Sequence, residues 1–203
     1  ITRFFSNIKY IFNKNTIKGS KKNIEAHYDL GNDFYKIWLD KSLTYSSALF
    51  TNENTSLFDA QMNKYKRIND ILKTHRDNKL LEIGTGWGGF MSYAKNDFDS
   101  LDSITISKEQ YSFSREVHKD NSNISIRYDD YRNINSTYNS IVSIEMFEAV
   151  GQEYWDTYFQ KINSLLVKNG KAVIQTITID DKLFDAYRNS TDAIRTFIFP
   201  GGM

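Results

Sequence analysis

Hydrophobic positions along the chain repeat with two spacings, one typical of buried strands and one typical of amphipathic helices. Short apolar runs with strand character cover residues 79–83, 103–106, 124–128, 140–145 and 171–178. Segments with helical spacing follow them at 88–95, from residue 107 onward, at about 152–167 and near 182–188. Strands that alternate with helices in this way predict an α/β fold, in which a parallel sheet carries helices on both faces.

The handedness of the connections predicts the order of the strands. Right-handed crossovers leave few arrangements, of which we favour 3-2-1-4-5. A ligand site is then expected at the carboxyl ends of the first and fourth strands, where the order reverses. The apolar run 172–178 would form an open edge if the protein ended at Met203. We therefore expect the chain to be part of a longer protein, with further strands after residue 203.

Residues 1–55 are predicted to form an N-terminal helical segment ahead of a domain at 56–203. Its first 24 residues carry several lysines and one arginine but no acidic side chain, and Phe4, Ile8 and Phe12 fall on one helical face. The pattern fits equally well a helix on an anionic membrane surface and a helix that packs on its own domain with its lysines in water.

Two further helices are predicted before the sheet. One covers the second half of residues 23–39, with Phe34, Ile37 and Trp38 pointing inward. The other runs from about residue 56 to 75, and its buried stripe is expected to consist of Leu57, Met62, Tyr65, Ile68 and Leu72. Between the helices, residues 43–50 are rich in hydroxyl groups, which would supply donors and acceptors in a ligand site or would simply form a turn.

Composition adds mainly exclusions to this picture. The net charge is +1, so no overall field selects nucleic acid, and no basic patch with interleaved aromatics lies near the expected site. The absence of cysteine excludes disulfides and thiolate chemistry, and the scattered histidines lack metal-ligand spacing, so no metal is expected. Since the chain has neither a bilayer-spanning apolar run nor a signal peptide, a cytoplasmic protein is expected.

The clearest chemical signal is the glycine-rich turn after the first strand, Gly84-Thr85-Gly86-Trp87-Gly88-Gly89. Glycine takes positive φ without penalty and lets a ligand lie against the backbone, and the following helix start favours a carboxylate or phosphate. The spacing lacks the third glycine of the dinucleotide fingerprint, so a methyl donor with an amino-acid carboxylate fits better than NAD. A tight turn without a ligand is the alternative interpretation.

Three polar segments are expected to meet this turn at the end of the sheet. Thr105 and Ile106 end the second strand, where a ribose and an adenine edge would rest, and Gln110 follows on the next helix, completing a capping box with Ser107. After the third strand, Asp130 and Tyr131 could accept from an adenine amino group or stack on its ring.

Two glutamates follow the fourth strand. Glu145 is interpreted with equal weight as a solvated loop acid or as a site residue. Glu148 stands between Phe147 and Ala149, where an acid needs a partner or a raised pKa, and such perturbation tends to mark a functional site.

Several blocks in the right order and spacing resemble the cyclopropane-fatty-acyl-phospholipid synthases and mycolic acid cyclopropane synthases, over nearly all of residues 20–203. The matching blocks lie at residues 27–35, 44–46, 81–89, 105–110, 130–132, 142–148 and 199–202. The resemblance implies a Rossmann-like class I methyltransferase fold. It also implies a cytoplasmic enzyme at the inner face of the membrane, which transfers a methylene from S-adenosylmethionine to the double bond of an unsaturated phospholipid acyl chain.

The resemblance further implies roles for individual residues. Donor contacts are implied at Tyr45, Ser46, Gly84, Gly86, Thr105, Gln110, Asp130 and Tyr131, and we also expect Glu82, Gly88 and Ile106 in the donor site. Glu148 and the backbone of Ile144 are implied to lie beside the reacting carbon, where a carbocation loses a proton to a bound bicarbonate. Candidates for an apolar tunnel wall are Phe34, Tyr35, Trp38 and Phe147. No nucleic-acid partner is expected, and a homodimer is left open.

Three positions depart from the family pattern. Ser47 stands where many members have cysteine, and Ala149 and Gln175 stand where they have histidine. Ser47 and Gln175, which we place in the catalytic site, can hydrogen-bond an anion but do not titrate near neutral pH. Either bicarbonate is held in another way, or the cation takes another route, such as methyl transfer that leaves a methyl branch without a ring. A methyltransferase-like module that binds lipid or a partner without catalysis is a further hypothesis.

Overall fold

The computed structural model describes residues 16, 19–20, 31–73 and 78–188. The predicted basic helix near the N-terminus therefore falls almost entirely outside the described residues, as do the last fifteen positions. The elements, in order, are α3 (Asn32–Lys36), α4 (Leu57–Leu72), β1 (Lys79–Ile83), α5 (Gly89–Ala94), β2 (Ser100–Thr105), α6 (Lys108–Val117), β3 (Ile124–Tyr128), η1 (Tyr131–Asn133), β4 (Tyr138–Ile144), η2 (Phe147–Ala149), η3 (Gln152–Tyr154), α7 (Trp155–Leu165), β5 (Leu166–Gln175) and α8 (Asp181–Arg188).

The five strands form one parallel sheet in the order β3-β2-β1-β4-β5, which confirms the predicted order. The register pairs Ile83 with Ile104, and Ile144 with Gln175. The carboxyl ends of the strands consequently meet at one edge of the sheet, and the order reverses between β1 and β4. This is where a doubly wound sheet places its ligands.

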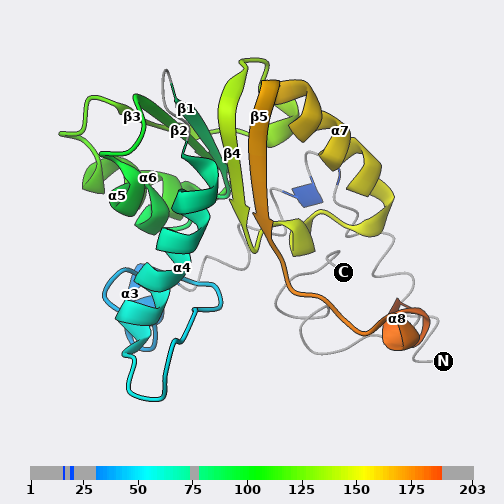
Figure 1. Ribbon diagram of the computed structural model, residues 1–203, viewed down its shortest axis with the longest axis horizontal. Helices are drawn as coiled ribbons and strands as arrows, with labels where there is room; N and C mark the ends of the chain where they lie inside the picture. Colours follow the sequence, from blue (N-terminus) through cyan, green and yellow to red (C-terminus); the bar gives the residue numbers. More distant parts are fainter. Residues whose placement is uncertain (1–15, 17–18, 21–30, 74–77, 189–203) are drawn as a thin grey trace.

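Helices cover both faces of the sheet (Figure 1). On one face, buried side chains of α4 and α5 pack on Leu80, Leu101 and Val142. On the other, buried side chains of α7 pack on Leu81 and Ile141. Alternate residues of β1 thus face opposite layers, as a strand requires. Among the described helices, none is long and apolar enough to cross a membrane.

Two predicted boundaries near the end of the sheet are wrong. Helix α7 ends at Leu165 instead of near residue 167, and β5 begins at once at Leu166 instead of at residue 171. Leu166 pairs with Tyr138, and a register shift follows before Ser140 pairs with Lys171. Residues 166 and 167 therefore belong to the strand, although their apolar spacing alone fits a helix. Strand pairing is a tertiary contact, and local periodicity carries no information about it.

Helix α3 buries a different side chain from those predicted. Phe34 and Trp38 are half exposed and Ile37 is 81% exposed, whereas Tyr35 is only 1% exposed. The ring of Tyr35 lies 4.7 Å from that of Trp87, between centroids. The helix has only five residues, of which only Tyr35 is buried, and the prediction that Phe34, Ile37 and Trp38 point inward is wrong.

Helix α4 buries more polar groups than its pattern indicates. Tyr65, Ile68 and Leu72 are buried as predicted, but Leu57 in the first turn is 41% exposed. Its buried face also carries the polar side chains Gln61, Lys64 and Asn69. The side chains of Gln61 and Lys64 hydrogen-bond Ser46, so this face of α4 holds the hydroxyl-rich segment in place.

Candidate functional site

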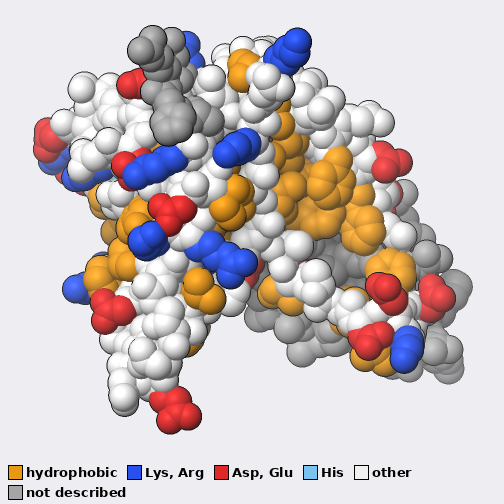
Figure 2. All heavy atoms as spheres, viewed as in Figure 1, with side chains coloured by type: hydrophobic (Ala, Val, Ile, Leu, Met, Phe, Trp, Pro, Cys, Tyr) orange, Lys and Arg blue, Asp and Glu red, His pale blue; other side chains and the backbone are white. Residues whose placement is uncertain are grey.

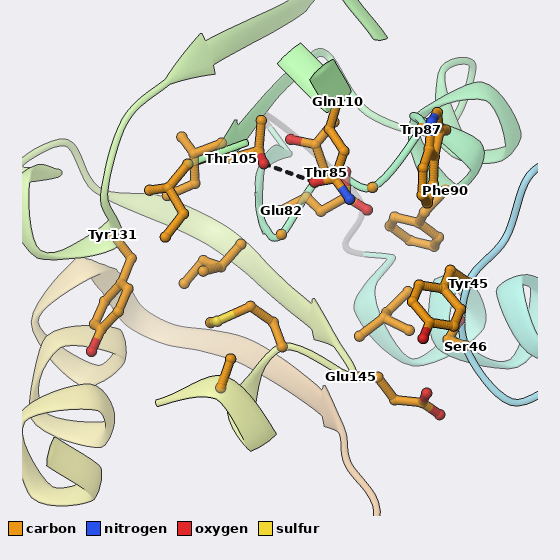
Figure 3. Close-up of a pocket in the computed structure, with 18 of the residues that line it drawn as sticks. Tyr45, Ser46, Glu82, Thr85, Trp87, Phe90, Thr105, Gln110, Tyr131 and Glu145 are labelled. Atoms are coloured by element: carbon orange, nitrogen blue, oxygen red, sulfur yellow. Dashed lines mark hydrogen bonds between the residues drawn. The ribbon is translucent and has the colours of Figure 1, made fainter. Parts of the chain in front are cut away.

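A pocket opens at the carboxyl ends of the strands, where the order of the sheet reverses (Figure 3). Of the residues predicted to contact a donor or the reacting carbon, those that line it are Tyr45, Ser46, Glu82, Gly84, Gly86, Thr105, Ile106, Gln110, Asp130, Tyr131 and Ile144. The structure does not place Gly88, Ser47, Gln175 or Glu148 in the lining. Glu145 does line the pocket, although its sequence context gave no preference for that role.

The glycine turn forms the floor of the pocket. Gly84 and Gly86 have φ of 98° and 53°, the left-handed region that favours glycine. A Cβ on Gly84 would lie 3.1 Å from the side chain of Met146, whereas a Cβ on Gly86 would meet nothing within 4 Å. The empty space beside Gly86 is therefore available to a ligand that lies against the backbone.

Gly88 serves packing on the far side of the turn. Its φ is 83°, and a Cβ there would come within 2.8 Å of Nε2 of His118. The same ring nitrogen lies 3.1 Å from the carbonyl oxygen of Gly88. The structure thus accounts for this glycine by its packing against His118, the residue that follows α6.

Glu82 lies at the end of β1 beneath the turn and is 3% exposed. Its Oε2 accepts a 2.6 Å hydrogen bond from Oγ of Ser103, which lies 2.7 Å from Oγ1 of Thr85. Burial raises the pKa of Glu82 to about 8, and the bond from Ser103 opposes the rise only in part. No salt bridge within the described part of the chain includes Glu82. A ligand ammonium group would therefore find an uncompensated acceptor here.

Thr105 and Gln110 form one wall of the pocket through a hydrogen bond between their side chains. Oγ1 of Thr105 donates to Oε1 of Gln110 at 2.9 Å and accepts from the backbone N–H of Ser107 at 3.1 Å (Figure 3). Oγ of Ser107 accepts from the N–H of Gln110 at 3.3 Å, which is half of the predicted capping box. The other half is wrong, because Thr105 holds both the Gln110 side chain and the N–H of Ser107.

The wall after β3 carries a tight ion pair. Asp130 accepts from Nη2 of Arg132 at 2.6 Å and from its Nε at 2.8 Å. Since Arg132 already uses both oxygens, Asp130 has less capacity to accept from a ligand than its sequence position indicates. Tyr131 is buried against Tyr158, with 5.3 Å between ring centroids, and lies across the pocket from Tyr45 (Figure 3). Burial raises the pKa of Tyr131, so its phenol stays neutral.

The hydroxyl-rich segment forms the opposite wall and is held by buried groups of α4. Oγ of Ser46 accepts a 2.6 Å hydrogen bond from Nζ of Lys64, and Oγ1 of Thr44 lies 2.7 Å from the phenol of Tyr65. Lys64 is 5% exposed, and burial lowers its pKa to about 8. The ring of Tyr45 packs on Trp38, with 5.2 Å between centroids. Ser46 and Tyr45 are thus positioned by contacts that the segment itself does not encode.

Two of the three departures from the family pattern, Ser47 and Gln175, meet at Glu145. Its Oε1 accepts from the N–H of Ser47 at 2.9 Å, from Oγ of Ser47, and from Nε2 of Gln175 at 2.9 Å. Glu145 has a φ of 47°, a conformation that only a few per cent of non-glycine residues adopt. Glu145 is half-buried and its carboxylate accepts these hydrogen bonds, which favours the interpretation as a site residue over that of a solvated loop acid. The position of Glu145 just after a central strand was the one sequence signal for a role in the site, and it did not by itself decide between the two interpretations.

Glu148 anchors the end of β5. Its Oε1 accepts from Oγ1 of Thr176 at 2.9 Å and from the N–H of Ile177 at 2.6 Å. Its Oε2 is buried and has no hydrogen-bond partner among the described residues. The neighbouring Phe147 packs on Tyr158 of α7, with 5.1 Å between centroids. Phe147 and the other proposed tunnel residues, Phe34, Tyr35 and Trp38, do not line this pocket.

The part of the chain that the structure describes holds no group of three or more His, Asp or Glu side chains that could bind a metal ion. The pocket instead combines an open glycine turn, a buried carboxyl, hydroxyl and amide groups and aromatic walls. This combination of groups suits an organic ligand that carries a positive charge.

Comparison with known sequences gives consistent matches. The family model described as mycolic acid cyclopropane synthetase matches residues 15–203. The chain is 36% identical over 198 residues to the tuberculostearic acid methyltransferase UfaA1 of Mycobacterium tuberculosis, covering 91% of this chain and 45% of that protein. It is 36% identical over 179 residues to the cyclopropane-fatty-acyl-phospholipid synthase of Escherichia coli K12, covering 88% and 45%. The chain thus spans about half the length of these relatives.

Two solved structures share the fold. The cyclopropane synthase MmaA2 from Mycobacterium tuberculosis matches with a TM-score of 0.81 and 28% identity, over 90% of this chain and 69% of that one. The mycolic acid cyclopropane synthase CmaA1, complexed with SAH and CTAB, matches with a TM-score of 0.81 and 30% identity, over 90% and 68%. These matches and the strand order confirm the predicted class I methyltransferase fold. The chain belongs to the mycolic acid cyclopropane synthetase family.

Proposed function

We propose that this chain carries the donor-binding part of an enzyme that transfers a one-carbon unit from S-adenosylmethionine to an unsaturated acyl chain of a membrane phospholipid, forming a cyclopropane ring. The observation that carries the proposal is the pocket at the reversal of strand order, where the open glycine turn lies above the buried Glu82. A relative that is 36% identical to this chain and is named a cyclopropane-fatty-acyl-phospholipid synthase also supports the proposal.

The residues of the pocket fit this donor. The space beside Gly86 suits its amino-acid end, and the Glu82 carboxyl suits its ammonium group. Thr105 and Gln110 present a hydroxyl and an amide to a ribose, and the ring of Tyr131 offers an apolar wall to an adenine. When bound, S-adenosylmethionine supplies an electrophilic methyl group on a positively charged sulfur.

The chain's own contribution is to hold an alkene in line with that methyl group and to exclude water from the resulting cation. Ile144, Met146 and Val150 contribute apolar side chains to the pocket lining, which suits an acyl chain. A phospholipid substrate would bring the working enzyme to the membrane, at its inner face in our proposal, and the basic N-terminal residues would favour anionic lipid there. A homodimer is compatible with this function but is not required by it.

Labelled S-adenosylmethionine and lipid vesicles test the proposal. The full-length protein should transfer label to vesicles of unsaturated phospholipid and not to vesicles of saturated phospholipid with the same head group. No label in either lipid would contradict the proposal. If the protein also gave no heat with S-adenosylmethionine in isothermal titration, a non-catalytic lipid-binding module would replace it.

A methyl-branched product is the second candidate. The observation that favours it is the replacement of the family's cysteine and histidines by Ser47, Ala149 and Gln175. A relative with the same 36% identity is named a methyltransferase instead of a cyclopropane synthase. Ring closure and a methyl group on a still-unsaturated chain give the same product mass, but only the second product reacts with ozone. Mass spectrometry before and after ozone treatment therefore separates the two products.

A further inference from the structure

Glu145 occupies the hydrogen-bond donors that an external anion would need. Ser47 donates to its Oε1 from both the backbone N–H, at 2.9 Å, and the hydroxyl group. Gln175 donates to the same oxygen at 2.9 Å, and its Nε2 also lies 3.1 Å from Oγ of Ser47. Ser47 and Gln175 stand at two of the three positions that depart from the family pattern, and both are committed to one carboxylate of the chain.

Bicarbonate does not fit this arrangement. An anion beside Ser47 and Gln175 would meet the negative charge of Glu145 and would compete for donors that Glu145 already uses. At the third position, the side chain of Ala149 has no polar atom in place of the family's imidazole. The residues at all three positions are therefore unsuited to holding a bicarbonate ion.

The backbone holds the carboxylate in its place. Glu145 directly follows β4 and has a φ of 47°, which is strained for a residue with a Cβ. Its N–H donates to the carbonyl oxygen of Gln175 at 2.8 Å. Glu145 is thus bonded to β5 through both its main chain and its side chain. Such strain persists where surrounding contacts determine it, and it marks functional sites more often than ordinary turns.

One carboxylate oxygen of Glu145 remains available. Oε1 takes all the side-chain hydrogen bonds recorded for Glu145 within the described residues, and Oε2 accepts none of them. The residue lines the same pocket as the glycine turn (Figure 3). On the neighbouring wall, the buried ammonium group of Lys64 donates to Ser46 at 2.6 Å and supplies a positive charge.

We propose that Glu145 is the proton acceptor of the transfer reaction and replaces an external bicarbonate; this inference rests on the proposed function. One alkene carbon bonds to the methyl carbon as the carbon–sulfur bond breaks, and the electron pair of that bond stays on sulfur. The other alkene carbon becomes positive. Oε2 of Glu145 then takes a proton, and the electrons of the broken C–H bond either close the ring or form a new double bond. Glu145 ends the step as a neutral carboxylic acid.

Two variants of the full-length protein test this assignment. Glu145→Gln keeps the shape and the acceptor oxygen but removes the base, so transfer should fall by about 10²-fold or more. Glu145→Gly removes the side chain and frees Ser47 and Gln175, and glycine tolerates the positive φ. In buffer depleted of carbon dioxide, the original protein should keep its activity. Glu145→Gly should lose activity there and recover it when bicarbonate is added.

A binding measurement provides a readout apart from activity. With SAH present, carbon-13-labelled bicarbonate should give no saturable line broadening with the original protein and should give it with Glu145→Gly. SAH affinity should stay within about threefold in both variants, because Glu145 is assigned no contact with the donor. Should Glu145→Gly fail to fold, the original protein's lack of bicarbonate binding and the loss of activity in Glu145→Gln decide the matter.

Three results would overturn the assignment: bicarbonate dependence of the original protein, saturable bicarbonate binding to it, or nearly full activity of Glu145→Gln. Failure of the proposed function would look different. The original protein would then label no lipid under any condition, while the bicarbonate titration would still report whether Glu145 fills the place of the anion.

Discussion

The hydroxyl of Ser103 on β2 donates a 2.6 Å hydrogen bond to Oε2 of Glu82 on β1, beneath the glycine turn. Glu82 is 3% exposed, and burial raises its pKa to about 8. One neutral hydrogen bond does not offset the loss of water around a carboxylate. The carboxyl is therefore protonated at neutral pH without a ligand, and a cationic ligand would convert it to the charged form.

The stability of the ligand-free protein should depend on Glu82. Since the folded pKa of about 8 lies above the ordinary value of 4.5, the folded state binds more protons between these values. The free energy of unfolding should therefore fall as pH rises from about 5 to about 8, by at most a few kcal/mol. Glu82→Gln should remove most of this slope in urea denaturation. The same slope in both proteins would contradict the raised pKa.

Binding of the donor should release protons through the same group. A ligand ammonium beside Glu82 favours the carboxylate, so SAH binding at about pH 7 should expel a proton. Titration calorimetry in two buffers of different ionisation enthalpy measures this release. Glu82→Gln should bind SAH roughly 10-fold to 100-fold more weakly and without proton release, as expected for the loss of a charge-assisted hydrogen bond. Unchanged affinity would show that Glu82 does not face the ammonium group.

Gly86→Ala should weaken donor binding more than it weakens the fold. A Cβ at Gly86 meets nothing within 4 Å, but φ is 53°, so alanine should cost about 1–2 kcal/mol of stability. Gly31→Ala is a control outside the pocket lining, because Gly31 also has positive φ and meets nothing within 4 Å. With φ of 82° and ψ of 154°, Gly31 lies in a region nearly restricted to glycine, so Gly31→Ala should lose at least as much stability as Gly86→Ala. Only Gly86→Ala should lose SAH affinity. Equal affinities would place the donor elsewhere.

Thr105→Val should show what the hydroxyl group of Thr105 contributes, because valine has nearly the same shape but no hydroxyl. The change removes the donor to Gln110 and the acceptor for the N–H of Ser107, so we expect a loss of about 1–3 kcal/mol in stability. SAH affinity should also fall, because the Gln110 side chain is no longer fixed. Thr105→Ser keeps the hydroxyl and should retain both properties. If chemical denaturation gives the two variants equal stability, the hydrogen bonds of the Thr105 hydroxyl do not position this wall.

Lys64→Met should stabilise the protein at neutral pH while it damages the site. Burial lowers the pKa of Lys64 to about 8 from 10.5, so the folded state disfavours the charged form. The destabilisation caused by burying the charged Lys64 is fully present below about pH 8 and disappears above about pH 10.5. The increase in the free energy of unfolding of Lys64→Met should therefore be largest at low pH, up to about 3 kcal/mol. Transfer activity should fall because Ser46 loses its 2.6 Å donor. A stability gain that grows with pH would contradict the lowered pKa.

Periodicity along the chain predicted the sheet more accurately than the short helices. The bounds of β1 and β3 and the order 3-2-1-4-5 agree with the structure, because buried parallel strands are continuous apolar runs and crossover handedness leaves few arrangements. The same reasoning failed at α3. Phe34 and Ile37 have apolar spacing but no partner layer on the domain, so they stay exposed and only Tyr35 is buried.

The sequence by itself determined the fold class, the glycine turn and the edge of the sheet where the pocket lies, because each depends on local chain geometry. Only the tertiary structure decided which side chains act together there. Ser47 and Glu145 are 98 residues apart, and Gln175 is 30 residues beyond Glu145, yet the pairing of β4 with β5 and the position of the hydroxyl-rich segment bring all three within hydrogen-bond distance. A hydrogen bond depends on separation and angle in space, and local sequence patterns specify neither for residues so distant in the chain.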